Sequence, residues 1–119
     1  MEYVKLFDAE YRVMQIIWDN EPLTSRELSE ICFNELSWQR TTTYTMLKRL
    51  IQKGYAQNEK KIVSSLISRE EVQKNESKDF VEKNFAGSLY SFIAAFTTDN
   101  KLDEEEIKKI KKLISDSKK

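Results

Sequence analysis

The apolar positions in the first half of the chain recur at helical spacing, which predicts three amphipathic helices. The first covers residues 8–18, and Pro22 ends its pattern because proline cannot continue a helix. The sequence "TSRE" at residues 24–27 has the form of a capping box, with a hydroxyl at the cap and a glutamate three residues later. It opens the second helix. The third helix is predicted over residues 39–53, with Gly54 as its left-handed C-terminal stop.

The period changes after the third helix, and the change predicts a β-hairpin. Its strands are residues 55–58 and 62–66, and the turn between them is residues 59–61. Three helices followed by a two-stranded wing give the outline of a winged helix-turn-helix. The predicted fold class is therefore mainly α with a small β-hairpin. Trp18 and Trp38 are expected to be core aromatics of the helical bundle.

A second helical region begins at Ser68, where "SREE" is another capping box. It opens a helix to about Phe85 in which apolar residues are sparse. Gly87 interrupts the pattern, and residues 89–96 then form a short, strongly apolar helix. After a polar loop, Asp103 caps a last helix whose apolar residues face one side. The second half is therefore predicted to contain three helices.

The chain is predicted to divide into a winged helix-turn-helix domain at residues 1–67 and a helical dimerisation region at residues 68–119. The second region offers little apolar volume to enclose, and segments this small seldom sustain a core alone. Such helices usually bury their apolar stripes against a partner, so homodimerisation is the natural completion. The residues expected to make the dimer contacts are Phe80, Phe85, Leu89, Phe92, Ile93, Phe96, Ile107, Ile110, Leu113 and Ile114.

The third helix carries the candidate chemistry. Its predicted inward positions are Thr43, Met46, Leu47, Leu50 and Ile51. The outward face holds hydroxyls, amides and cations, and the threonines at its N-terminus stand beside free backbone N–H groups that suit a phosphate. Thr45 can offer a methyl and a hydroxyl to a base edge, and Arg49 can reach a guanine or a phosphate. The candidate DNA-binding residues are Arg40, Thr41, Thr42, Tyr44, Thr45, Lys48, Arg49, Lys60 and Lys61.

The charge distribution favours DNA as the partner. The whole chain is neutral, with 20 basic and 20 acidic residues. Residues 38–61, however, contain six cations against Glu59 alone, a local net charge of +5. A neutral protein with one concentrated basic face matches the electrostatic footprint of a duplex binder. Taken alone, the third helix is equally compatible with an ordinary solvated face and capping threonines; the helix before it and the basic hairpin after it favour DNA.

Nothing in the sequence argues for an enzyme or a metal protein, and no enzymatic activity is expected. It has no histidine and a single cysteine, Cys32, which removes the usual general base and any zinc site built from N and S ligands. Cys32 is expected to be a buried apolar thiol. The acids at residues 103–106 complement a helix dipole and lack the spacing of a calcium loop. The N-terminus lacks a signal-peptide pattern and residues 89–96 are too short to span a bilayer, so no cofactor, no membrane partner and a cytoplasmic location are expected.

Several stretches resemble, in order and spacing, the BlaI/MecI/CopY family of bacterial transcriptional repressors. They are "DAEYRVMQIIWDNEPLTSREL", "WQRTTTYTMLKRLIQKGY", "LISREE" and "AGSLYSFIAAFTTDNKLDEEEIKKIKKLI". The resemblance implies a dimeric winged-helix repressor on palindromic operators, which controls β-lactamase, penicillin-binding-protein or copper-export genes. By position, Thr41, Thr42, Thr45 and Arg49 match the DNA-contacting helix of the family.

The resemblance also implies how the repressor is released. In the antibiotic-responsive branch, a membrane sensor-protease signals the drug and the repressor is cut in its dimerisation region. The cleaved bond corresponds to Ala95–Phe96, where this chain has alanine in place of the asparagine of those members. The C-terminus lacks the cysteine-rich metal motif of the copper branch, which disfavours that branch. The second wing strand also lacks the tyrosine usual in the family.

The resulting prediction is a dimeric DNA-binding repressor that occupies a palindromic operator and is released by an inducing signal, by proteolysis in a β-lactam response. The alternative is a winged-helix protein-interaction module without specific DNA binding, because winged helices also serve as docking domains. A salt-dependent shift of duplex DNA separates the two, since counterion release gives DNA binding a steep salt slope. A small hydrolase or transferase lacks a candidate base.

Overall fold

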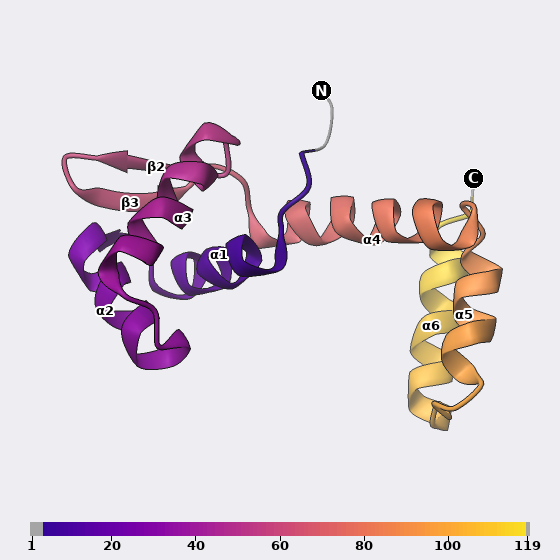
Figure 1. Ribbon diagram of the computed structural model, residues 1–119. Helices are drawn as coiled ribbons and strands as arrows, with labels where there is room; N and C mark the ends of the chain where they lie inside the picture. Colours follow the sequence, from indigo (N-terminus) through magenta and orange to yellow (C-terminus); the bar gives the residue numbers. More distant parts are fainter. Residues whose placement is uncertain (1–3, 119) are drawn as a thin grey trace. The chain divides into compact units, whose positions relative to one another are not determined.

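The computed structural model describes residues 4–118. The chain divides into two compact units, Met1–Ser77 and Lys78–Lys119. The first unit contains α1 (Asp8–Asn20), β1 (Leu23–Thr24), α2 (Ser25–Leu36), α3 (Arg40–Gln52), β2 (Ala56–Glu59), β3 (Ile62–Ser65) and the start of α4 (Arg69–Phe85). In Figure 1 the helices α1, α2 and α3 pack around a common centre, and the β2–β3 hairpin follows α3. The predicted three helices and wing are therefore confirmed. The predicted domain division after residue 67 stays a prediction.

The sheet has one strand more than the sequence predicts. Its order is β1-β3-β2, and both pairs are antiparallel. In β1, Leu23 pairs with Val63 and Thr24 pairs with Ile62. A two-residue strand is too short to show an alternating pattern, and Thr24 also serves as the cap of the next helix. The sequence pattern therefore does not reveal β1.

The predicted capping box of α2 is present. Glu27 N donates to Thr24 Oγ1 over 3.0 Å, and Thr24 N donates to Glu27 Oε1 over 3.1 Å. The backbone N–H of Thr24, and after it the Thr24 side chain, lower the pKa of the Glu27 carboxyl by hydrogen bonding to it. At the C-terminal end of α3, Lys53 is the C-cap. Gly54 follows it with a φ of 84°, the left-handed conformation that was predicted for the residue ending this helix.

A single hydrophobic core holds the first unit together. Its fully or nearly buried apolar residues are Leu6, Val13, Met14, Ile16, Ile17, Leu23, Leu28, Cys32, Leu47, Leu50, Tyr55, Ala56, Val63 and Val72. Trp18 and Trp38 are half-buried and pack against this core, as predicted. Burial raises the pKa of the Cys32 thiol. Val72 belongs to α4, so the start of that helix is part of the same core.

One predicted core position is wrong. Ile51 was expected to face the bundle, but its side chain is 39% exposed. The other four predicted inward positions of α3 are buried or half-buried. Ile51 lies at the edge of the apolar stripe, and the wing leaves that edge open. A helical pattern specifies which face is apolar, and the neighbouring elements decide how wide a stripe they cover.

The second unit contains the end of α4, α5 (Leu89–Thr97) and α6 (Glu104–Asp116). The side chains of Ser88 and Asp103 cap α5 and α6 by accepting from Ser91 N over 3.1 Å and from Glu106 N over 2.8 Å. α5 and α6 lie side by side (Figure 1). All residues of these two helices are described, and none of their side chains is buried in the single chain. The unit therefore has helices without an enclosed core.

Candidate nucleic-acid interface

The outward face of α3 is exposed as the sequence predicts. Thr41, Tyr44, Thr45, Lys48 and Arg49 are exposed along it. The helix buries Thr43, Leu47 and Leu50 on the opposite side. Arg40 is exposed at the first position of the helix, and Thr42 is half-buried at the third position, within the first turn. The arrangement presents hydroxyls and cations to solvent along one side of α3, which is the geometry that a helix needs to enter a groove of DNA.

The hydroxyl of Thr45 is partly committed. Thr45 Oγ1 donates to the backbone oxygen of Thr41 over 2.9 Å. With its hydrogen used, the hydroxyl keeps acceptor capacity, and the methyl group remains available. Thr45 is therefore suited to accept from the exocyclic amine of adenine or cytosine, or to contact a thymine methyl.

The basic face holds one available cation fewer than the charge count in the sequence suggests, because the Lys53 side chain contacts other groups of the protein. Its Nζ lies 2.6 Å from Oε1 of Glu10, a carboxylate only 1% exposed, and donates to the backbone oxygen of Lys5 over 3.1 Å. The same nitrogen lies 4.2 Å from the centre of the Phe7 ring. The charge count in the sequence included Lys53 because Glu10 stands 43 residues away and gives no local signal.

The wing carries two cations on a tight turn. Lys60 and Lys61 connect β2 to β3 with φ of 51° and 70° and are both exposed. Two-residue hairpin turns of this kind normally use asparagine and glycine, which tolerate positive φ at little cost. Two lysines in this conformation store strain of about 1–3 kcal/mol each. Such strain at an exposed cationic tip is a feature of functional sites.

An open groove of about 870 Å³ joins the wing to α3 and to the N-terminus of α2. Its lining residues are Thr24, Ser25, Arg26, Tyr44, Leu47, Lys48, Ile51, Gln52, Asn58 and Lys61. Among these described residues three are cations and none is acidic. The apolar side chains Tyr44, Leu47 and Ile51 contribute to the walls. The groove thus brings together three of the predicted residues, Tyr44, Lys48 and Lys61.

The sequence analysis missed the contribution of α2 to this groove. Ser25 and Arg26 occupy the first turn of α2, directly after its cap. The capping box at residues 24–27 could have indicated this contribution. It locates the start of α2, and exposed residues in a first helical turn lie beside free backbone N–H groups. Arg26 forms an exposed ion pair with Glu30, with its Nε 3.4 Å from the carboxylate. Exposed pairs of this kind are weak, so Arg26 remains available to an anion.

Arg40 lies apart from the groove. It lines a separate hollow of about 490 Å³ with Gln39 and with α2 residues that include Glu30 and Phe33. Phe33 is 57% exposed there. The remaining predicted residues line neither the groove nor this hollow, and are placed by their positions on α3 and the wing tip; they are Thr41, Thr42, Thr45, Arg49 and Lys60. Their role in DNA binding stays a prediction.

The predicted dimerisation residues form a largely exposed apolar surface on the second unit. Six of them are exposed and the other four are half-buried. The rings of Phe80, Phe85, Phe92 and Phe96 form a chain of neighbours with centroid separations between 5.5 and 6.2 Å. An apolar hollow of about 220 Å³ opens beside them, lined by Phe92, Ile93, Phe96, Thr97, Leu102, Glu106 and Ile110. Ala95, the other residue of the predicted cleaved bond, is exposed on α5.

Two further observations concern the described part of the chain. Among residues 4–118, no group of three or more Cys, Asp or Glu side chains is arranged to hold a metal ion. None of the helices in the same range is both long and apolar enough to cross a membrane.

The fold and the exposed face of α3 define the class of the protein as a winged helix-turn-helix protein. Its sequence matches the model of the penicillinase repressor family over residues 6–116. The chain belongs to that family.

Characterised relatives align with the chain over nearly its whole length. It is 26% identical to the methicillin resistance regulatory protein MecI of Staphylococcus aureus strain N315, over 93% of this chain and 94% of that protein. It is 26% identical to the penicillinase repressor of Bacillus licheniformis, over 96% of this chain and 92% of the relative. The penicillinase repressor of Staphylococcus aureus is 28% identical over 95% and 93% of the two chains.

A solved structure matches the fold. The DNA-binding domain of the repressor BlaI superimposes with a TM-score of 0.52 and 28% sequence identity. The match covers 56% of this chain and 87% of that domain. The winged-helix fold predicted from the sequence is therefore confirmed.

Proposed function

We propose that this protein is a DNA-binding transcriptional repressor and not an enzyme. The observation that carries the proposal is the exposed, acid-free face of α3, on which Thr45, Lys48 and Arg49 project from a winged-helix unit. The names of the relatives, penicillinase repressor and methicillin resistance regulatory protein, support the same function. The genes that it represses belong, on this proposal, to a response to β-lactams.

The residues of α3 and the wing have different roles in the recognition of duplex DNA: some contact bases and the others contact the sugar–phosphate backbone. Arg49 pairs with a guanine in the major groove, and Thr45 contacts the neighbouring base edge with its methyl and acceptor oxygen. Arg40, Thr41 and Thr42 stand in the first turn of α3, where the positive end of the helix dipole and the threonine hydroxyls suit a phosphate. The other candidates, Tyr44, Lys48, Lys60 and Lys61, contact the sugar–phosphate backbone.

The groove between α3, the wing and α2 receives one sugar–phosphate strand. Three cations, Arg26, Lys48 and Lys61, line it without an acid among the described lining residues, which suits a polyanion. Its apolar part, formed by Tyr44 and Ile51, suits the deoxyribose face of the same strand. This occupant also accounts for the exposure of Tyr44 and Ile51 on a helix that buries Leu47 and Leu50.

The active form is a homodimer on a palindromic operator. The second unit supports this, because its helices leave an apolar surface uncovered in the single chain. Monomeric proteins rarely expose large contiguous apolar patches, and such patches mark interfaces. A two-fold dimer places two copies of α3 on two half-sites of a palindrome.

Induction separates the two copies. A sensor-protease that cuts the Ala95–Phe96 bond removes the end of α5 and all of α6 from the dimer surface, because both follow the cut. The exposure of both residues supports their accessibility in the monomer. Loss of the dimer lowers operator affinity, since each half-site then binds without the gain from linkage.

The proposal is tested with a duplex selected from random sequences by the purified protein. Its dissociation constant is measured by fluorescence anisotropy at several salt concentrations, and the affinity should fall steeply as salt rises. Arg49→Ala should cost about 1–3 kcal/mol of binding free energy and relax the base preference at one position per half-site.

Arg12→Ala is the matched control, because Arg12 is an exposed arginine on α1, outside the face described above. It should leave base preference unchanged. Equal binding by Arg49→Ala and the parent at physiological salt would show that α3 is not the recognition helix. Failure to select any duplex would favour the protein-interaction module.

A further inference from the structure

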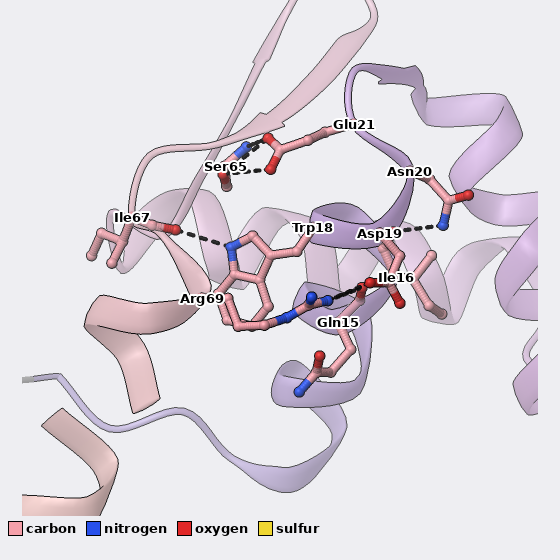
Figure 2. A network of polar contacts seen from close by, with 9 residues as sticks. All are labelled: Gln15, Ile16, Trp18, Asp19, Asn20, Glu21, Ser65, Ile67 and Arg69. Atoms are coloured by element: carbon pink, nitrogen blue, oxygen red, sulfur yellow. Dashed lines mark hydrogen bonds and ion pairs between the residues drawn. The ribbon is translucent and has the colours of Figure 1, made fainter. Parts of the chain in front are cut away.

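A cluster of residues from α1, the loop after it and the start of α4 holds the short connection between the wing and α4. We call the four residues Trp18, Asp19, Glu21 and Arg69 the clamp. Trp18 Nε1 donates to the backbone oxygen of Ile67 over 3.0 Å (Figure 2). The guanidinium of Arg69 forms an ion pair with the carboxylate of Asp19 and lies over the Trp18 ring, 5.4 Å from its centre.

The clamp also fixes the end of the wing. The carboxylate of Glu21 accepts from Ser65 N over 2.8 Å and from Ser65 Oγ over 2.9 Å, at the last residue of β3 (Figure 2). Arg69 donates in addition to the backbone oxygen of Gln15 over 3.4 Å. Both ends of the connection between β3 and α4 are therefore tied to α1 and to the loop that follows it.

The first turns of α4 are held as firmly as the connection before them. Ser68 Oγ accepts from Glu71 N over 3.1 Å and caps the helix. Val72, one turn later, is completely buried in the core of the first unit. A loop without such ties would allow the helix to pivot. Here hydrogen bonds, an ion pair and a buried side chain all oppose pivoting.

The clamp lies outside the proposed DNA-facing groove. Its four residues lie on α1, on the loop after α1 and at the start of α4, and none lines the groove beside α3. α4 then continues without a break through Phe85, as one helix of 17 residues.

We propose that the clamp sets the spacing between operator half-sites that the dimer accepts, because it holds the first turns of α4, the helix through which the winged unit is connected to the dimer surface. The inference rests on the dimeric DNA binding proposed above. In a dimer, half-site spacing follows from the geometry that joins the two recognition helices. A joint that pivots gives a broad range of spacings and a smaller gain from linked binding. The clamp residues are thus positioning residues for operator selection.

The test uses the full chain and three sets of duplexes. One duplex carries a single half-site, one carries the selected operator, and the others have the operator spacer lengthened or shortened by one or two base pairs. Arg69→Met removes the ion pair and keeps an apolar stem. Trp18→Phe keeps an aromatic ring and removes the hydrogen bond to Ile67. Each variant is first checked for cooperative thermal unfolding.

The parent should bind the altered spacers at least about tenfold more weakly than the operator, because they no longer match the fixed geometry. Both variants should bind the single half-site within about twofold of the parent, and should lose about tenfold in affinity for the operator. They should also discriminate less between spacers. Arg69→Lys, which keeps the charge opposite Asp19, should recover part of the spacer preference.

Lys83→Met is the matched control, because it removes an exposed ion pair from α4, that of Lys83 with Asp79 at 3.3 Å, and leaves the clamp intact. It should keep the spacer profile of the parent. An unchanged profile in Arg69→Met and Trp18→Phe would overturn the inference. An equal loss on the half-site and the operator would overturn it as well, since the clamp would then act on the winged fold. If the parent itself bound no duplex, the proposed function would fail instead.

Discussion

Replacement of Phe96 by alanine tests the proposed dimer most directly. Phe96 lies on α5, beside Phe92 at a ring separation of 6.2 Å, and its side chain is 49% exposed in the single chain. An aromatic side chain buries roughly 200 Å² when fully covered, so about 100 Å² remains for a partner to cover. At about 25 cal/mol per Å², that area stabilises the dimer by about 2.5 kcal/mol per copy.

A two-fold dimer loses this contribution twice, because the same residue is removed from both copies. The expected loss is about 5 kcal/mol of association free energy, which raises the dimer dissociation constant by about three to four orders of magnitude. Sedimentation equilibrium over a concentration series measures that constant. Phe96→Ala should be monomeric at micromolar concentration and should bind the operator no better than a half-site, with the winged unit still folded.

Phe33→Ala is the matched control, since Phe33 is an exposed phenylalanine on α2 of the first unit, 57% exposed. It removes a similar area of exposed aromatic surface and should leave the dissociation constant unchanged. If Phe96→Ala dimerised as tightly as the parent, Phe96 would lie outside the dimer interface and the calculation above would be refuted.

Three further changes test other parts of the structure. Lys60→Asn with Lys61→Gly should raise the free energy of unfolding by at least about 1 kcal/mol, because these residues tolerate positive φ, and should weaken binding to all duplexes alike; calorimetry and anisotropy measure the two effects. Lys53→Met should lower the free energy of unfolding in urea by about 3–5 kcal/mol, because it leaves the buried Glu10 carboxylate without its cation; no loss would show that the pair is dispensable. Burial raises the pKa of the Cys32 thiol above its ordinary value of 9.0. The stability that the buried, protonated thiol contributes is therefore present below pH 9.0 and falls as the pH rises above that value. When the free energy of unfolding is measured at increasing alkaline pH, Cys32→Ala should lose less stability than the parent.

The helices and their ends could be predicted because their signals are local. The Thr24 cap with Glu27 three residues later and the glycine after Lys53 each act within one helical turn. The outward face of α3 followed from the same periodicity, since the apolar residues that fix it are three and four positions apart. Candidate residues on that face could therefore be named before the structure.

Contacts between distant segments could not be predicted in this way. Lys53 and Glu10 are 43 residues apart, and Arg69 and Asp19 are 50 apart, so neither partner is visible in the pattern around the other. Each pair gives a charged residue a distant partner. Lys53, which the charge count placed on the basic face, contacts a buried carboxylate, and Arg69, for which the sequence pattern predicts no role, belongs to the clamp.

The roles of the charged residues thus depend on what lies opposite them more than on the helix that carries them. Lys48 and Lys53 stand five positions apart in one segment, yet Lys48 lines the open groove while Lys53 contacts a buried carboxylate. Removing Lys48 takes away a cation that water and counterions already screen, whereas removing Lys53 strands a charge in the core. A loss of DNA binding therefore has a different cause for each lysine: a lost surface cation for Lys48, and a destabilised fold for Lys53. Only an accompanying measurement of folding stability separates the two causes.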